Sequence, residues 1–171
     1  MSSSLLGFFQ WLQETSVSVG IRESTWTYPI IESAHVLGLC LFLGFAMLWD
    51  LRLLNVTLRG VPVSDVNSRV MPWTQVGFLI MLISGGLLFW AVPVRFYGNI
   101  FFRVKLIALV LAGANAAFFH FFTAGKRLIE WDNSPISPTS AKVAGIISLA
   151  LWSAIVVFGR FIAYNWFDPL V

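Results

Sequence analysis

Charged residues are scarce in this sequence. They make up 11% of its 171 residues, against about 25% in a typical soluble domain, while hydrophobic residues reach 58%. A chain of this length cannot hide so much apolar surface in its own core. Together with a mean hydropathy of +0.82, this excess predicts that lipid surrounds most of the chain. The composition excludes a disordered tail and a soluble nucleic-acid binder.

Cysteine is almost absent as well. Cys40 is the single cysteine and lies in an apolar run, so the chain has neither a disulfide scaffold nor a pair of thiolates for a metal. The N-terminal segment lacks the basic start and the small-residue cleavage site of a secretory signal peptide, and we expect residue 1 to belong to the mature protein. The absence of Ser-His-Asp order, glycine-rich phosphate loops and paired carboxylates argues against soluble-type hydrolases and kinases.

Long apolar runs are what the sequence does contain. Four of them can cross about 30 Å of hydrocarbon as helices, namely residues 28–51, 72–92, 100–123 and 143–164. Because unpaired backbone groups cannot face lipid, we predict an all-α fold, an antiparallel four-helix bundle that forms one transmembrane domain over residues 1–171. Residues 4–14 carry their apolar side chains on one face, which predicts a short helix at the membrane interface.

The loops indicate orientation, because cytoplasmic loops of membrane proteins are rich in Lys and Arg. The first and third loops hold most of the loop cations: Arg52, Arg59, Arg69, Lys126, Arg127 and Lys142. Both termini are therefore expected on the non-cytoplasmic side. In the first loop, Ser64 is positioned to cap a short helix that runs towards Pro72, where the second span is expected to begin.

Ionisable residues within a membrane span are costly and are the first places to look for function. At about 1.5 Å per residue, the outer half of the bundle gathers Glu32, His35, Lys105 and Arg160 at one level. Arg103 lies on another side of its helix and is expected to reach the outer headgroups. His120 lies nearly 18 Å deeper than His35, so the two histidines are not expected to hold one haem iron.

Several short motifs carry a resemblance to known proteins. They are His35-Val36-Leu37-Gly38, Trp49-Asp50-Leu51-Arg52, Pro72, Gly85-Gly86 and Lys105-Leu106-Ile107. Across residues 28–125 the chain resembles bacterial four-helix membrane proteins that include the CopD copper-resistance family and the HemJ type of protoporphyrinogen oxidase. The resemblance implies a b-type haem or a metal in the bundle and a place in the bacterial inner membrane. It also implies that His35 and Lys105 form a functional pair.

Two interpretations of the outer cluster stay open at this point. In the first, His35 is the ligand of a haem b iron, Lys105 and Arg160 hold its propionates, and Glu32 orients the imidazole. The protein would then be an electron-transfer protein or a membrane oxidoreductase. In the second, the same side chains form a buried ionic network in a structural or assembly subunit, or in a small copper-type transporter. Copper is the weaker metal hypothesis, because no His-x-His or Met-x-x-Met spacing is present.

His120 and the small residues raise two further expectations. The imidazole of His120 either tips into the headgroups or binds a second haem or a quinone, with Asn115 or Gln75 nearby. The small-residue stripe formed by Ala108, Ala112 and Ala116, together with Gly85-Gly86, allows close helix contact. We therefore expect a homo-oligomer or a subunit of a larger membrane complex.

Overall fold

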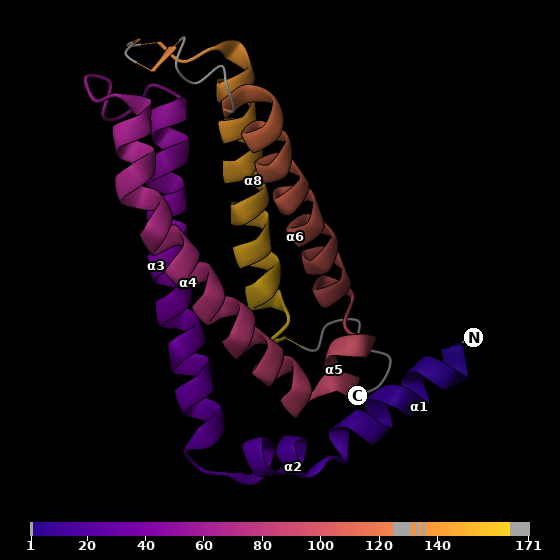
Figure 1. The fold of residues 1–171 in the computed structure, drawn as a ribbon. Helices are drawn as coiled ribbons and strands as arrows, with labels where there is room; N and C mark the ends of the chain where they lie inside the picture. Colours follow the sequence, from indigo (N-terminus) through magenta and orange to yellow (C-terminus); the bar gives the residue numbers. More distant parts are fainter. Residues whose placement is uncertain (1, 125–130, 133, 135, 165–171) are drawn as a thin grey trace.

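The chain forms a bundle of long helices (Figure 1). A computed structural model describes residues 2–124, 131–132, 134 and 136–164, and these contain helices and no strands. Four helices are long and apolar enough to cross a membrane: α3 (Thr27–Leu53), α4 (Val63–Ala91), α6 (Ile100–Phe118) and α8 (Thr139–Phe161). The predicted all-α membrane bundle is thereby confirmed.

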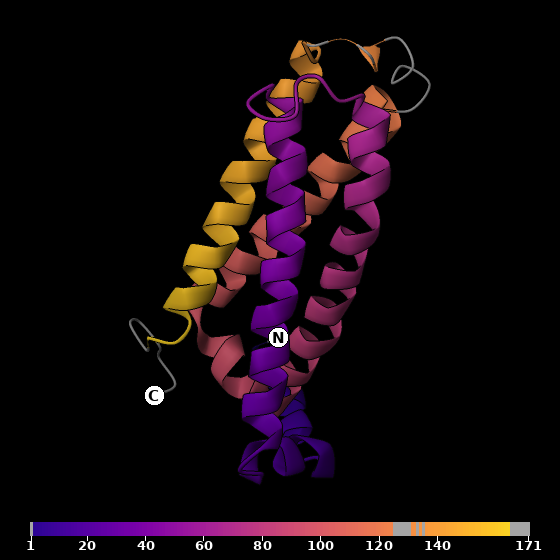
Figure 2. The ribbon, with the colours of Figure 1, turned by 90° about the vertical axis from the view of Figure 1, so that its left-hand side faces the viewer.

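The four long helices pack as two pairs. α3 lies against α4, α6 lies against α8, and contact between α3 and α8 joins the pairs. Seen from the side, α3 stands between α8 and α4 (Figure 2). The backbones of α4 and α6 have at most marginal contact, and the rings of Phe89 and Phe102 stack between them with centroids 5.6 Å apart. Beyond this ring pair, the bundle is open between the two helices.

Glycines allow helices α3 and α4 to approach each other closely. A Cβ atom placed on Gly77 of α4 would lie 2.5 Å from the backbone nitrogen of Phe42 on α3, and one placed on Gly38 would lie 2.7 Å from Cγ2 of Ile80. On the other pair, Ala108 and Ala112 of α6 are buried against Ile155 of α8. The alanines of the small-residue stripe at these two positions thus pack within the chain.

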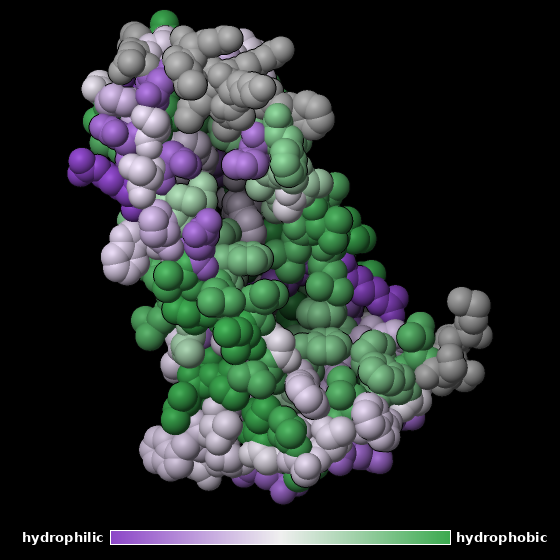
Figure 3. Space-filling view, viewed as in Figure 1, coloured by the Kyte–Doolittle hydropathy of each residue, from purple (hydrophilic) through white to green (hydrophobic). Residues whose placement is uncertain are grey.

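Short helices cover the end of the bundle where α3 begins (Figure 1). α1 (Ser2–Gln13) matches the predicted interfacial helix, whereas α2 (Ser16–Glu23) and α5 (Pro93–Gly98) were not predicted. α2 is tied to the end of α4, because the Ser18 hydroxyl and Nη1 of Arg22 both donate to the Ala91 carbonyl, at 3.1 and 3.3 Å. The surface is polar at both ends with an apolar band between them, as expected for a chain that spans a bilayer (Figure 3).

The predicted helix boundaries differ from the observed ones in three places. Pro72 does not open the second span: α4 begins at Val63 and continues through the proline, with Pro62 rather than Ser64 at its cap. A proline removes one hydrogen bond of the helix, a loss that membrane helices tolerate. α6 ends at Phe118 and continues as a π-helical segment, η1 (Phe119–Ala124), while α8 begins at Thr139 and ends at Phe161.

At the opposite end, hydrogen bonds from the third loop hold the start of α4. The Asp132 carboxylate accepts from the backbone N–H and the hydroxyl of Ser64, both at 2.7 Å. These two bonds hold the pKa of Asp132 below its ordinary value. In the same region Oδ1 of Asn55, a residue with a positive φ of 58°, accepts from the N–H and the hydroxyl of Ser137. Asp132 therefore supplies the cap that the helix itself lacks.

Candidate functional site

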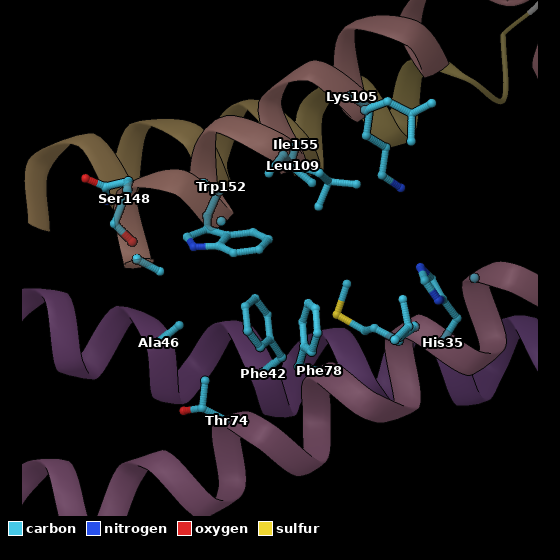
Figure 4. A pocket seen from close by; sticks show the side chains of 18 of the residues that line it. His35, Phe42, Ala46, Thr74, Phe78, Lys105, Leu109, Ser148, Trp152 and Ile155 are labelled. Atoms are coloured by element: carbon cyan, nitrogen blue, oxygen red, sulfur yellow. The ribbon is translucent and has the colours of Figure 1, made fainter. Parts of the chain in front are cut away.

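A large cavity runs along the inside of the bundle. Its volume is about 1290 Å³, and α3, α4, α6 and α8 all contribute to its lining. The molecular surface is hollowed between the α4 side and the α6 side (Figure 3), where the backbones of these two helices lie apart. Side chains from both helix pairs point into the cavity (Figure 4). This cavity opens towards the part of the surface that lipid would cover.

His35 lies at one end of the cavity and is half-buried. Its Nδ1 lies 2.9 Å from the hydroxyl oxygen of Ser84, and that hydroxyl lies 2.6 Å from the carbonyl oxygen of Ile80 one turn earlier on α4. A serine hydroxyl has one proton, and here it is donated to Ile80. By this hydrogen-bond accounting Nδ1 of His35 carries the proton and donates to Ser84. Nε2 is then left with a free lone pair, which is the form that binds metals.

Two glycines make room for the side chains at this end. A Cβ atom on Gly85 would lie 3.1 Å from Cε1 of His35, so a larger residue there would crowd the imidazole. A Cβ atom on Gly159 of α8 would lie 3.4 Å from Nζ of Lys105. Lys105 projects from α6 into the cavity towards the side on which His35 lies (Figure 4). The predicted pair of His35 and Lys105 thus shares one cavity.

Glu32 and Arg160, which share the level of this pair, point elsewhere. Both are exposed, and neither lines the cavity. The guanidinium of Arg160 lies over the ring of Tyr164, 5.8 Å from its centroid. Ser84, rather than Glu32, is the hydrogen-bond partner of the His35 ring. The structure therefore brings together two of the four residues expected in the outer cluster.

Arg103 lies near the start of α6, two residues before Lys105. It is exposed, its Nη2 donates to the Tyr97 carbonyl at 2.9 Å, and its guanidinium lies 5.4 Å from the centroid of the Tyr97 ring. It also contributes to the cavity lining. Arg103 is thus a cation that lines the same cavity as His35, although the sequence made it the weakest member of the outer cluster, able to reach the headgroups.

His120 lies far from this end. It belongs to η1, is exposed, and packs its ring edge-on to Phe121 at 5.5 Å between centroids. It lines the opposite end of the cavity, fifteen residues beyond Lys105 or about 22 Å of helix. Asn115 also lies there, and its Nδ2 donates to the Ala144 carbonyl at 3.0 Å. Gln75 is exposed and does not line the cavity.

Sequence reasoning missed Asp50. Its side chain lines the cavity, is 4% exposed, and has an Oδ2 atom without a hydrogen-bond partner among the described residues. Asp50 lies inside the predicted first span, and acidic residues within a span are rare enough to single it out. The sequence interpretation treated Asp50 only as part of the Trp49–Arg52 motif at the inner end of the first span.

The possible copper ligands are scattered. Cys40 is exposed on α3, and Met47 is 40% exposed, whereas Met71 and Met81 line the cavity. Within the described part of the chain, no group of three or more His, Cys, Asp or Glu side chains is placed to hold a metal ion. Any metal at His35 would therefore depend on ligands other than these side chains, as the iron of a haem does.

A family model matches residues 8–165, nearly the whole chain, and its description is a family of unknown function, DUF6644. The chain belongs to this family. The match covers all four long helices and the cavity between them. Neither the curated proteins nor the solved structures that were searched gave a match. Membership in DUF6644 establishes no activity.

Proposed function

We propose that this DUF6644 protein binds a b-type haem at the His35 end of the cavity and serves electron transfer or a redox reaction within the membrane. The observation that carries the proposal is the state of His35. Its imidazole lines a large, mostly apolar cavity, and its Nδ1 is within hydrogen-bond distance of the Ser84 hydroxyl. A neutral imidazole whose other nitrogen is hydrogen-bonded is the usual protein ligand of haem iron.

The other groups at this end suit the remaining parts of a haem. The propionates of the macrocycle need cations, and Lys105 and Arg103 both line the cavity there. The macrocycle itself needs apolar walls, which Phe89, Phe96 and Phe102 provide. The cavity volume of about 1290 Å³ exceeds the roughly 300–1000 Å³ of common small-ligand pockets. The donor set and the space therefore fit the group.

When bound, haem supplies one-electron redox chemistry that side chains lack. The role of the protein is to bind the haem and to tune its reduction potential. Ser84 holds the imidazole in one orientation, Lys105 and Arg103 offset the propionate charges, and the apolar lining keeps water away from the macrocycle. Burial in an apolar site and the hydrogen bond between His35 and Ser84 would tune the potential of a bound haem.

The cellular setting belongs to the same proposal. The loop cations and the resemblance support a location in the bacterial inner membrane with both termini on the non-cytoplasmic side. A redox role also calls for a partner, either a second copy or another subunit of a membrane complex. Ala108 and Ala112 are used within the chain, so a contact with another subunit would use other faces.

The two histidines provide a direct test. The protein is expressed with added haem, purified in mild detergent, and examined by visible spectroscopy beside its His35→Ala and His120→Ala variants. We expect His35→Ala to lose the Soret band and His120→Ala to keep it, because His120 lies at the opposite end of the cavity. Haem that is retained by His35→Ala and lost by His120→Ala would overturn the assignment.

The competing interpretation is a non-enzymatic subunit or small transporter whose polar groups are structural. It predicts a colourless protein in which His35→Ala lowers thermal stability, because Ser84 loses its partner. Stability measured on the same samples separates the two functions. A copper-type transporter would instead bind Cu(I) in equilibrium dialysis, and loss of that binding in Met81→Leu would support it.

A further inference from the structure

The opposite end of the cavity is a second site with different chemistry. We call it the Asp50 end and define it by Asp50, Thr74, Asn115 and Ser148, which line the cavity there. Fifteen residues of α3, or about 22 Å of helix, separate Asp50 from His35. A ligand at the Asp50 end is therefore not the group proposed for His35, and its binding does not depend on haem.

Asp50 is the group at this end that lacks a partner. Its side chain is 96% buried, and the described residues offer no hydrogen bond to Oδ2. On the other side of the carboxyl group, Ser148 of α8 provides a hydrogen bond. Buried polar atoms in native proteins are almost always paired, since an unpaired one costs about 1–3 kcal/mol. Asp50 lines the cavity, and an unpartnered carboxylate oxygen on a cavity-lining residue points to a ligand that donates a hydrogen bond.

The polar side chains near Asp50 already donate hydrogen bonds to backbone carbonyls. The Thr74 hydroxyl donates to the Val70 carbonyl at 3.0 Å, and Nδ2 of Asn115 donates to the Ala144 carbonyl at 3.0 Å. What Thr74 then offers the cavity is an oxygen lone pair, and Asn115 offers its side-chain carbonyl and its second amide N–H. The Asp50 end thus has acceptors on Asp50, Thr74 and Asn115, and these suit a ligand with hydroxyl or amine donors.

Aromatic rings separate the two ends of the cavity. The rings of Phe42 and Trp152 meet edge to face with centroids 4.5 Å apart, and Phe78 lies 5.8 Å from Phe42. All three line the cavity, with Ser148 and Thr74 on one side of them and His35 on the other (Figure 4). Such rings pack favourably against another flat ring. The ligand expected at the Asp50 end therefore has a planar ring.

The opening between α4 and α6 indicates where the ligand comes from. The backbones of these helices have at most marginal contact, and the surface between them is hollowed in its apolar band (Figure 3). A molecule that enters there comes from the hydrocarbon of the bilayer and must be largely apolar. A planar ring with hydroxyl donors and an apolar tail describes a hydroquinone lipid.

We propose that the Asp50 end binds the ring of a lipid-soluble hydroquinone, with Asp50 accepting a hydrogen bond from one ring hydroxyl. Thr74 and Asn115 accept from the other hydroxyl or from solvent that enters with it. This places the quinone-type ligand on Asp50, whereas the sequence alone suggested His120 with Asn115 or Gln75. Binding of the reduced form is favoured, because the oxidised quinone has carbonyls in place of the two donors.

Binding of decylubiquinol is the test. The full chain is reconstituted in lipid nanodiscs and titrated by isothermal calorimetry with decylubiquinol, with decylubiquinone and with 1-decanol. We expect the quinol to bind at least about tenfold more tightly than either of the others, because one charge-assisted or buried hydrogen bond contributes about that factor in affinity. Asp50→Asn should weaken quinol binding by at least about tenfold, whereas the matched exposed acid variant Asp65→Asn should leave it unchanged.

Further outcomes decide the location of the ring. Asp50→Leu, which keeps the site filled and apolar, should also lose quinol binding, while His35→Ala should retain it. In the unmodified protein, decylubiquinol should slow the labelling of Asp50 by dicyclohexylcarbodiimide, as measured by mass spectrometry. Equal affinity of the wild type and both Asp50 variants, or equal affinity for 1-decanol and quinol, would overturn the proposal. Because the His35→Ala spectrum tests haem separately, either proposal can fail while the other holds.

Discussion

The hydroxyl of Ser84 connects two helices at the centre of the proposed haem site. It lies between the imidazole of His35 on α3 and the carbonyl of Ile80 on α4, at 2.9 and 2.6 Å. Through this arrangement a single serine sets the tautomer and the orientation of the histidine. The outer partners of metal-ligating histidines generally act in this way.

Replacing Ser84 with Ala should therefore weaken haem binding without removing the ligand. Loss of such a partner typically lowers metal affinity by about 10–100-fold, and we expect haem to leave Ser84→Ala at least about tenfold faster. The measurement is the rate of haem transfer to apomyoglobin, followed by visible absorbance. Ser153→Ala, an exposed serine on α8, is the control. Equal rates in the wild type and Ser84→Ala would show that Ser84 has no role in the site.

A second prediction for a single residue concerns Asp132 and pH. Hydrogen bonds from the backbone N–H and hydroxyl of Ser64 hold the pKa of Asp132 below its ordinary value of 3.8. A lowered pKa in the folded state means that the stabilisation is present above the ordinary pKa and is lost as pH falls through the lowered one. Asp132→Ala should thus lower the free energy of unfolding by about 0.5–2 kcal/mol near neutral pH.

Thermal unfolding followed by circular dichroism in detergent measures this effect between about pH 7 and about pH 2. The difference in midpoint between the wild type and Asp132→Ala should shrink as the pH falls, because protonated Asp132 no longer caps α4 as a carboxylate. A difference that stays constant across this range would mean that the charge of Asp132 does not stabilise the start of the helix.

At the scale of helices, the contact between α3 and α4 forms one rigid side of the cavity. Gly77 lies directly against the backbone of Phe42, with 2.5 Å from its would-be Cβ to the Phe42 nitrogen and 2.8 Å to Cα. The backbone cannot yield as a side chain does, so any larger residue must separate the two helices. Separation would also displace His35 and Phe42, which face the cavity from α3.

Gly77→Ala should accordingly destabilise the bundle by about 1–3 kcal/mol, the usual cost of overpacking. The matched control is Gly44→Ala on α3, where a Cβ meets nothing within 4 Å. Thermal unfolding in the same detergent should give a lower midpoint for Gly77→Ala and an unchanged or higher one for Gly44→Ala. Equal midpoints for the two variants would contradict the close helix contact.

For the molecule as a whole, the sequence predicts the fold and the depth of each residue better than it predicts the facing of side chains. Depth follows from a fixed rise of about 1.5 Å per residue, and His35 and Lys105, which were expected at one level, line the same cavity. The direction in which a side chain points, into the bundle or out of it, depends on how the helices pack against one another. For that reason Glu32 and Arg160, at the same depth, were expected in the cluster and instead lie on the surface.

Helix boundaries and buried polar groups were harder to predict for local reasons. Pro72 was interpreted as a helix start, although a membrane helix continues through a proline when tertiary contacts hold both sides. Asp50 lies one turn from the end of α3, where a carboxyl group normally reaches water. Only the contact of α8 through Gly145, whose Cβ would lie 3.2 Å from the Asp50 carbonyl, shows how closely this segment is enclosed.

At this scale, the molecule is a membrane bundle with an opening between α4 and α6 and two polar ends in one cavity. The measurement that most directly tests its proposed redox role is the reduced-minus-oxidised visible spectrum of the wild-type protein purified after haem-replete expression. We expect a Soret band and the α-band of a b-type haem, with about one haem per chain because one free imidazole faces the His35 end. A colourless, folded protein under these conditions would contradict the proposal.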